Sequence, residues 1–243
     1  MELKNTEIIY GRQPTFEVLR GFRKIYTIYA TTSALKWLKE KANTNNVEIT
    51  ADIQSVEKEK LHNLVRHPDH QGIAAKVEKY KYTSEKIILD RRPSLILFAD
   101  SITDPHNLGA IIRSANLFGV GAVIIPEKNS ADINPVVVHS SAGATEHTPI
   151  VRLKSIIHFL HLLKERNYTI ISAVKPNDDA ISVIDYDING NIALVMGSEG
   201  KGISKKIMNI CDTKVYIPQY GEIDSFNVSV ATGILLYQLR TKL

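Results

Sequence analysis

Three segments of the chain place polar residues and glycines directly after a run of apolar residues. They hold Asn107 and Arg113 in the first, Gly197 to Gly202 with Glu199 in the second, and Ser225 and Asn227 in the third. Amides and hydroxyls can orient a ligand, a guanidinium can grip a phosphate, and glycines let the backbone approach a ligand closely. The set offers no thiolate nucleophile and no histidine base, so any chemistry here has to come from positioning and charge.

The glycine-rich segment lacks the spacing of the common nucleotide-binding loops. Its sequence, Gly-Ser-Glu-Gly-Lys-Gly, matches neither the P-loop nor the dinucleotide pattern, and Glu199 would repel a pyrophosphate. A carboxylate there suits a cationic or hydroxyl-bearing ligand, and a plain glycine turn with a solvated Glu199 is the alternative. The chain has no Gly-x-Ser-x-Gly elbow and its eight histidines show no zinc spacing, so we predict neither a serine hydrolase nor a metal site.

From Leu95 onward, strand-sized apolar runs alternate with helical patterns, and the three segments follow such runs. The expected strands are Leu95–Ala99, Ala122–Ile125, Thr169–Ala173, Ile192–Met196 and Val215–Ile217, and the expected helices are Leu108–Phe118, Pro135–Ala144, Lys154–Arg166, Ser204–Cys211 and Asn227–Arg240. Unbroken apolar strands are typical of a parallel sheet covered on both faces. The alternation indicates a doubly wound α/β architecture, whose ligands bind at the carboxyl ends of the strands.

Most of these polar residues also have ordinary structural explanations. Arg113 falls opposite the apolar stripe of its helix, as a solvated surface arginine would. Asn107 and Ser225 are each suited to capping a helix N-terminus. Asn227 is harder to explain, because an amide that enters so apolar a helix must find hydrogen-bond partners. We expect that last helix to be buried or to lie in a subunit interface.

The first part of the chain is predicted to be a small α/β module. Its expected strands are Ile25–Ala30, Val47–Thr50 and Gly72–Val77, and its expected helices are Pro14–Leu19 and Ser33–Lys41, the latter capped by Ser33. A stretch rich in lysine and arginine follows and closes at Pro93. We therefore predict one domain over residues 1–80, a linker over 81–93 and a second domain over 94–243.

The composition is that of an ordinary folded protein of 243 residues, with 44% hydrophobic and 23% charged residues. The formal charge is 30 − 26 = +4, a mild bias that suits a polyanionic partner without requiring one. The longest apolar runs are far below the roughly 20 residues that cross a bilayer. The first residues form no apolar leader and Cys211 is the only cysteine, so we expect a cytoplasmic protein without disulfides or membrane attachment.

Taken together, the three segments resemble the three motifs of the SpoU family of RNA ribose 2′-O-methyltransferases, within the SPOUT superfamily. The matching residues are Asp104–Ala115, Val195–Gly202 and Ile217–Ala231. Ile9–Arg12 and His70–Ala75 resemble the beginning and end of the ribosomal-protein-like substrate-binding domain that precedes the catalytic domain in one branch of the family. The resemblance thus covers almost the whole chain.

Membership of this family would imply a catalytic domain with a trefoil knot, S-adenosylmethionine as cofactor and a homodimer. Carried over by position, the residues that would line the cofactor pocket are Gly197, Ile217 and Phe226, the last standing where the family usually has leucine. Carried over likewise, the catalytic residues would be Asn107, Arg113, Glu199, Ser225 and Asn227. An arginine is a poor base because it titrates only above about pH 12, so we interpret Arg113 as a clamp on the phosphate beside the target ribose, with direct deprotonation of the hydroxyl by Arg113 as the less favoured alternative.

The branch that the leading domain resembles methylates a guanosine of 23S rRNA, which makes rRNA the expected partner. Candidate phosphate contacts in that domain are Arg12, Arg20, Arg23 and Lys24, and solvated surface charge is an equally good explanation of each. The alternatives are a tRNA guanosine 2′-O-methyltransferase and a non-catalytic RNA-binding protein of the same fold. An ordinary nucleotide-dependent α/β enzyme is a third, already weakened by the glycine spacing.

Overall fold

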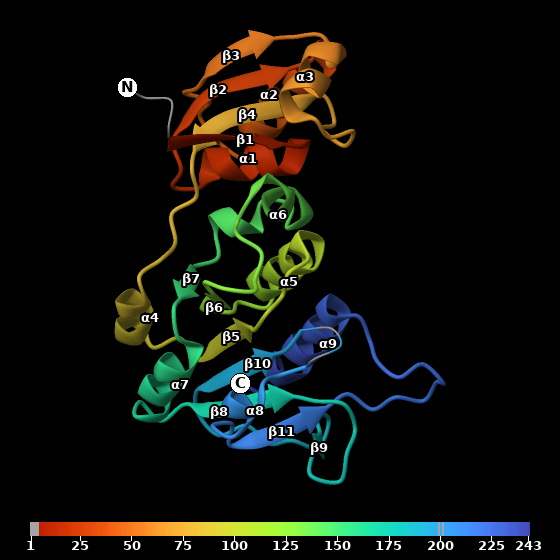
Figure 1. Ribbon diagram of the computed structural model, residues 1–243. Coiled ribbons are helices and arrows are strands. Elements are labelled where there is room, and N and C mark those ends of the chain that lie inside the picture. The colour runs from red at the N-terminus through yellow and green to blue at the C-terminus, as the bar shows by residue number, and fades with distance from the viewer. Residues whose placement is uncertain (1–4, 199, 201) are drawn as a thin grey trace. The chain divides into compact units, whose positions relative to one another are not determined.

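The computed structural model describes residues 5–198, 200 and 202–243 of the chain (Figure 1). The chain divides into two compact units. Unit 1 comprises the chain up to Lys81 together with Ile133–His147, and unit 2 comprises Tyr82–Asp132 and Thr148–Leu243. The predicted boundaries 1–80, 81–93 and 94–243 would place Ile133–His147 in the second domain, whereas the structure groups this segment with the leading part of the chain. The domain boundaries themselves stay a prediction. Among the described residues, no helix is long and apolar enough to cross a membrane.

Unit 1 is built on a mixed sheet in the order β1-β4-β2-β3. Its strands are β1 (Thr6–Tyr10), β2 (Ile25–Ala30), β3 (Asp52–Ser55) and β4 (Ile73–Glu78), and its helical segments are α1 (Arg12–Arg20), α2 (Thr32–Thr44), α3 (Lys58–Val65), α6 (Pro135–Ser140) and the 3₁₀ turn η2 (Ala144–Glu146). Side chains alternate between the faces of a strand. One face of β1 therefore packs Tyr10 with Leu61 of α3, while Ile9 is buried on the other face.

Two predictions in unit 1 are wrong in detail. Val47–Thr50 is not a strand, because the backbone of Val47 closes the C-terminus of α2 by donating to Ala42 O (2.9 Å), after Asn46 has taken a left-handed conformation with φ 53°. The strand begins only at Asp52. Helix α2 is capped by Thr31 and not by Ser33, since the Thr31 hydroxyl accepts from Ala34 N (3.4 Å).

Unit 2 is built on a seven-stranded sheet within its described residues, in the order β7-β6-β5-β10-β8-β11-β9. The strands are β5 (Leu95–Ala99), β6 (Ala122–Pro126), β7 (Ile150–Leu153), β8 (Thr169–Ala173), β9 (Ile181–Ser182), β10 (Ile192–Met196) and β11 (Thr213–Tyr216). Every pairing between them is parallel. The expected parallel α/β sheet is confirmed, and β7 and β9 are additions that its sequence did not suggest.

Helices cover both faces of this sheet (Figure 1). They are α4 (Glu85–Arg91), α5 (Pro105–Leu117), α7 (Ile156–Lys164), α8 (Lys205–Met208) and α9 (Val228–Arg240). On one face, Ile96 and Phe98 of β5 join a core with residues of α7 such as Phe159. On the other face α5 and α9 pack against each other. The trefoil knot stays a prediction.

The predicted linker contains a helix. Glu85–Arg91 forms α4 because Ile88 finds a place in the core of unit 2, where it is 1% exposed. The charged residues around it had suggested a solvated connection, but Ile88 and the partly buried Leu89 both pack against the core of unit 2.

Candidate active site

A pocket of about 730 Å³ opens in unit 2 at the carboxyl ends of the strands. Strands β10 and β11 lead directly into it through Met196, Gly197 and Ile217, and the start of α9 closes it with Phe226 and Val228. The sheet therefore brings together two of the three segments that the sequence singled out, although they lie some twenty residues apart in the chain.

The second segment folds back tightly on itself. Gly202 N donates to Ser198 O (3.0 Å), and the two residues form an isolated antiparallel bridge. A side chain at Gly197 would place its Cβ only 2.3 Å from the backbone carbon of Gly202. Glycine is therefore required at Gly197 for this closure, and Gly197, Ser198, Gly200 and Gly202 all line the pocket.

Apolar side chains make up much of the remaining lining. Ile203, Met208, Val215, Ile217 and Leu235 contribute, and Phe226 lines the pocket while keeping 41% of its surface exposed. All three residues proposed for cofactor contact, Gly197, Ile217 and Phe226, thus face the same pocket. Apolar walls with a few backbone polar groups are typical of sites for small organic ligands.

The third segment is tied to the first through a pair of amides. Asn227 donates from Nδ2 to Asn107 Oδ1 (3.1 Å), although the two residues are 120 positions apart. Its own Oδ1 accepts from Ser229 N (2.9 Å) and from the Ser229 hydroxyl (2.6 Å). These bonds fix the orientation of the Asn227 amide. They also account for the polar residue at the start of an apolar helix, because Asn227 is the N-cap of α9.

The expected caps at Asn107 and Ser225 are both wrong. Helix α5 is capped by Asp104, which accepts from His106 N (2.9 Å), so Asn107 lies within its first turns and its side chain is available to Asn227. Ser225 is exposed and lines the pocket beside Asn227. Ser229, which the sequence analysis passed over, completes the network.

Arg113 lies on the exposed side of α5, as its place opposite the apolar stripe predicted. It follows Asn107 by six residues, or about 9 Å along a helix axis. Within the described part of the chain, Arg113 makes no ion pair or side-chain hydrogen bond, which leaves its guanidinium available to a ligand. Glu199, proposed as its partner, lies outside the described residues.

Asp100, directly after β5, is a further polar residue that the sequence analysis missed. It is 8% exposed, its backbone N donates to Met196 O (2.9 Å), and its carboxylate accepts from the Ser101 hydroxyl (3.1 Å). Burial raises the pKa of Asp100, and the Ser101 hydrogen bond opposes part of that shift. The sequence feature that could have drawn attention to Asp100 is its position, a carboxylate immediately after the fully apolar strand Leu95–Ala99.

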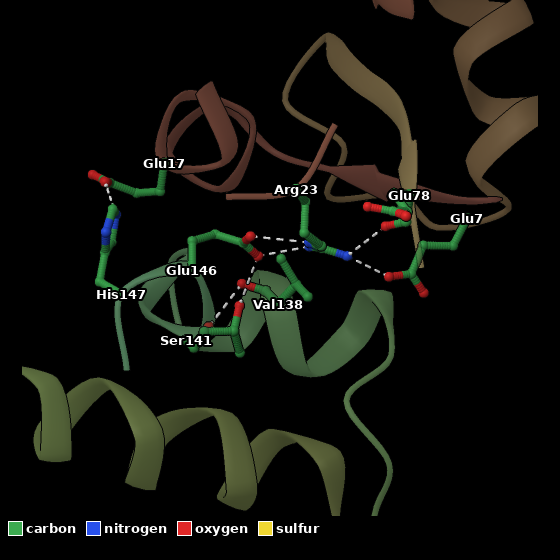
Figure 2. Close-up of polar contacts among 9 residues, drawn as sticks. Glu7, Glu17, Arg23, Glu78, Val138, Ser141, Glu146 and His147 are labelled. Carbon is green, nitrogen blue, oxygen red and sulfur yellow. Dashed lines mark hydrogen bonds and ion pairs between the residues drawn. The ribbon is translucent and has the colours of Figure 1, made fainter. Parts of the chain in front are cut away.

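The four cations proposed for RNA contact in unit 1 are in different situations. The Arg23 side chain is 7% exposed and lies between carboxylates (Figure 2). It donates to Glu146 from Nε (2.9 Å) and Nη2 (2.6 Å) and to Glu7 from Nη1. These ion pairs raise the pKa of Arg23 even though its burial alone would lower it. Glu146 and Glu7 thus balance the charge of Arg23 inside unit 1, which argues against the predicted contact of Arg23 with RNA.

The other three cations reach the surface. Arg20 pairs with Glu17 (3.0 Å) while its side chain stays 46% exposed, and Lys24 lies 5.0 Å from the ring centroid of Tyr26. Arg12 donates from Nε to Gln71 O (3.3 Å) and lies over the ring of Trp37. Within the described residues no carboxylate pairs with Arg12 or Lys24, so these two cations keep their charge available.

Two protein families match the chain. Residues 94–237 match the SpoU rRNA methylase family, and residues 8–83 match the family described as RNA 2′-O ribose methyltransferase substrate binding. The first match covers all three segments, the two that line the pocket and the one joined to them through Asn107 and Asn227. The second covers most of unit 1.

Individual proteins that are similar to this chain are also named as RNA methyltransferases. A protein of Mycolicibacterium vanbaalenii named as an uncharacterized tRNA/rRNA methyltransferase is 34% identical over 97% of this chain and 76% of its own length. The 23S rRNA (guanosine-2′-O-)-methyltransferase RlmB of Acinetobacter baylyi is 34% identical over 76% of this chain and 77% of its own. The fold matches that of the SpoU methyltransferase AviRb from Streptomyces viridochromogenes, solved in complex with AdoMet, with a TM-score of 0.77 at 24% identity over 98% of this chain and 90% of that one. The pocket, the motifs around it and these matches together establish that the chain belongs to the SpoU rRNA methylase family.

Proposed function

We propose that this protein is an RNA ribose 2′-O-methyltransferase that uses S-adenosylmethionine and acts on a guanosine of 23S rRNA. One observation carries the proposal. The three family motifs converge at the carboxyl edge of one sheet, with Gly197, Ile217 and Phe226 in a single pocket and with Asn227 bonded to Asn107. RNA methyl transfer is the chemistry of the family to which the chain belongs.

The residues that line the pocket fit S-adenosylmethionine. The volume of about 730 Å³ is in the range of small-molecule sites, roughly 300–1,000 Å³. Apolar side chains such as Ile217 and Leu235 suit an adenine ring, and the backbone of the Gly197 loop can meet its polar edge closely. When bound, the cofactor supplies a methyl group already activated on a sulfonium. Solved relatives from Streptomyces viridochromogenes and Sinorhizobium meliloti hold AdoMet.

In this proposal the protein's own task is to align the ribose and to manage one proton. A hydroxyl is a poor nucleophile until its proton is at least partly removed. Arg113 grips the phosphate beside the target ribose and lowers the pKa of the 2′-hydroxyl by its positive charge, so that the hydroxyl proton can pass to solvent water as the oxygen is methylated. Glu199 orients Arg113, while Asn107, Ser225 and Asn227 hold the ribose and the loops by hydrogen bonds. Alignment of reacting groups can supply about 7–11 kcal/mol of a barrier.

Two findings favour 23S rRNA over tRNA as the substrate. RlmB of Acinetobacter baylyi, whose name specifies a 23S rRNA guanosine, shares 34% identity with this chain. Unit 1 matches a substrate-binding family that precedes the catalytic domain, and a separate module suits the reading of a folded RNA. We propose that the protein acts in the cytoplasm, where such RNA is assembled into ribosomes.

We also propose that the protein is a homodimer, with α5 and α9 at its interface. Three large apolar side chains on these helices are exposed: Leu117 (74%), Val230 (50%) and Tyr237 (54%). Val230 and Tyr237 are seven residues apart on α9 and so lie on one face. Phe118, the C-cap of α5, packs against Tyr237 at 6.2 Å between ring centroids. Light scattering tests this. The wild type should have twice the mass of the chain and Tyr237→Glu should have the mass of one chain, whereas a monomeric wild type would contradict it.

The substrate is tested by following the transfer of a labelled methyl group from S-adenosylmethionine to purified RNA. Ribosomal RNA from cells that lack this enzyme should accept about one methyl group per 23S molecule, and tRNA should accept none. Arg113→Ala is the control for catalysis by the protein itself. Labelling of tRNA alone would replace the substrate, and labelling of neither RNA would overturn the proposed activity.

A further inference from the structure

A second polar cavity lies in unit 1, far along the sequence from the three family motifs. Its volume is about 660 Å³, and the residues of interest in its lining are Arg12, Thr31, Ser33, Lys58 and Asp69. A neighbouring cavity of about 400 Å³ shares Thr31 and Ser33 with it. The larger cavity offers hydroxyls, two cations and the carboxylate of Asp69 within a space large enough for a nucleotide, and the smaller one adds the carboxylate of Glu57.

The side chain of Arg12 is held in place by its neighbours, but the outer N–H groups of its guanidinium can still bind a ligand. Its Nε donates to Gln71 O (3.3 Å), its guanidinium carbon lies 5.7 Å from the centroid of the Trp37 ring, and its backbone N donates to Gln71 Oε1 (2.9 Å). Within the described residues nothing accepts from Nη1 or Nη2. An arginine fixed through Nε and a ring presents its outer N–H groups as a fork that matches a phosphate, and little side-chain entropy is lost on binding.

Lys58 supplies the second cation at the first position of α3. It is exposed and forms no ion pair within the part of the chain that the structure describes. Arg20, Arg23 and Lys81 of unit 1 are paired with carboxylates. Among the described residues Arg12 and Lys58 are not, a property they share with other lysines of the unit such as Lys39 and Lys60, but these two line a cavity.

The remaining polar groups define what else the ligand must carry. Asp69 lines the cavity, and a carboxylate accepts hydrogen bonds from a ribose hydroxyl or from the N–H groups of a base. Burial lowers the pKa of His70, helped by the nearby Lys58, so this imidazole is neutral at pH 7 and leaves Lys58 and Arg12 as the cations. A bare anion would meet Asp69 unfavourably, whereas a ligand with both a phosphate and hydrogen-bond donors would satisfy the whole set.

We propose that this cavity binds one nucleotide of the RNA substrate, with Arg12 and Lys58 on its phosphate, Thr31 and Ser33 beside its sugar, and Asp69 accepting from its ribose or base. The inference rests on the proposed function, since it supposes an RNA substrate. It adds a defined contact through which unit 1 holds that RNA. Lys58 and Asp69 had no assigned role in the sequence analysis.

The test compares two lysines on one helix. Lys58→Ala removes a cavity cation, and Lys60→Ala is the matched control, because Lys60 is an equally exposed lysine of α3 that does not line the cavity. The full chain is titrated into a fluorescein-labelled fragment of 23S rRNA at several salt concentrations, with anisotropy as the readout. Heat of S-adenosylmethionine binding, measured on the same preparations, reports whether unit 2 is intact.

We expect Lys58→Ala to weaken RNA binding about tenfold, as for the loss of one charge-assisted contact. The slope of log affinity against log salt should fall by about 0.7–0.9, the value for one phosphate. Lys60→Ala should stay within about twofold of the wild type, on the expectation that exposed charges outside the contact contribute little. Arg12→Lys keeps the charge but loses the fork, so it should weaken binding as well.

Equal affinities and slopes for the two lysine variants, beside a wild type that binds the fragment, would overturn the cavity assignment and leave the proposed function standing. A wild type that binds S-adenosylmethionine but no RNA would overturn both. An Asp69→Asn variant sharpens the result: it should reduce preference for RNA over DNA of the same sequence if Asp69 accepts from the 2′-hydroxyl, and an increase in that preference would count against the assigned orientation.

Discussion

The two units hold their polar residues in contrasting ways. In unit 2 the pocket is walled by glycine backbone and apolar side chains, and its few polar side chains are held by amide and hydroxyl hydrogen bonds such as that between Asn227 and Asn107. In unit 1 charged side chains are more prominent. Some, such as Arg23 with Glu146 and Glu7, form ion pairs inside the unit, and others, such as Arg12 and Lys58, have no carboxylate partner among the described residues. The first arrangement suits orientation of a small cofactor, and the second leaves unpaired cations for a polyanion.

Arg12 and Arg23 show why residue type alone is a weak guide to RNA contact. Arg12 begins α1 and Arg23 lies in the connection between α1 and β2, and both were plausible phosphate ligands in the sequence. Arg23 is buried between Glu146 and Glu7, whereas Arg12 is fixed by a carbonyl and a ring that leave its charge uncompensated. What separates a structural arginine from a binding arginine is therefore its partner, and the partner Glu146 is 123 residues away.

The largest effect should come from breaking the ion cluster in unit 1. Arg23→Met leaves Glu146, whose side chain is 1% exposed, without its counter-charge, and removal of one member of a buried pair costs about 3–5 kcal/mol. Urea unfolding followed by circular dichroism measures the change. Arg20→Met is the matched variant and should cost less than about 1 kcal/mol, since the Arg20 side chain is 46% exposed and its partner Glu17 keeps a second partner in His147 (2.6 Å). Equal losses in the free energy of unfolding for the two variants would contradict the distinction between a buried ion pair at Arg23 and a partly exposed one at Arg20.

In unit 2 the corresponding test is Arg113→Ala. Turnover should fall by about 10²–10³-fold, the range for loss of one group that stabilises developing charge, while affinity for S-adenosylmethionine is kept. Methyl transfer under single-turnover conditions and calorimetry provide the two readouts. Arg91→Ala, at the end of α4, is an exposed control that should retain full activity. Undiminished methylation by Arg113→Ala would remove this arginine from the mechanism.

Gly197→Ala tests the backbone character of the pocket. The added Cβ would meet the Gly202 backbone at 2.3 Å, so the loop must shift, and overpacking of this kind costs about 1–3 kcal/mol. Affinity for S-adenosylmethionine should therefore fall by about tenfold or more by calorimetry. Gly221→Ala, where a Cβ meets nothing within 4 Å, is the control and should bind as the wild type does. Unchanged binding by Gly197→Ala would mean that the cofactor does not use this loop.

The smallest effect is expected at Asp100. Its folded-state pKa is raised by burial, so its contribution favours the folded state below the unfolded pKa and is lost as pH rises through the folded value. Asp100→Asn should thus be more stable than the wild type at neutral pH, by about 1 kcal/mol or less, with the difference vanishing in acid. Thermal unfolding from acid to neutral pH measures it. A variant that loses stability at neutral pH would show that the carboxylate has a partner it needs.

The sequence predicted much of unit 2 because its central strands β5, β6 and β10 are almost entirely apolar and its motifs lie in the segments that follow the strands. Gly197, Ile217 and Phe226 were assigned to one pocket from motif positions, and all three line it. The sequence could not predict that Asn227 caps α9 or that Asp104 caps α5, because several residues able to cap a helix lie within a few positions of the start of each helix. Unit 1 was harder, because the fate of Arg23 depends on Glu146 in a distant segment and the position of β3 depends on how Val47 closes α2.

Under the proposed function the methyl group is transferred to a ribose oxygen of a guanosine in 23S rRNA, and the position of the added methyl group tests this directly. Wild-type protein is incubated with S-adenosylmethionine and 23S rRNA, the RNA is digested to nucleosides, and mass spectrometry locates the added methyl. A methyl group on the ribose O2′ of a guanosine, absent with Arg113→Ala, is the predicted result. A methyl group on a base, or none on any RNA despite bound S-adenosylmethionine, would contradict the arrangement of Asn107, Arg113 and Asn227 around a sugar hydroxyl.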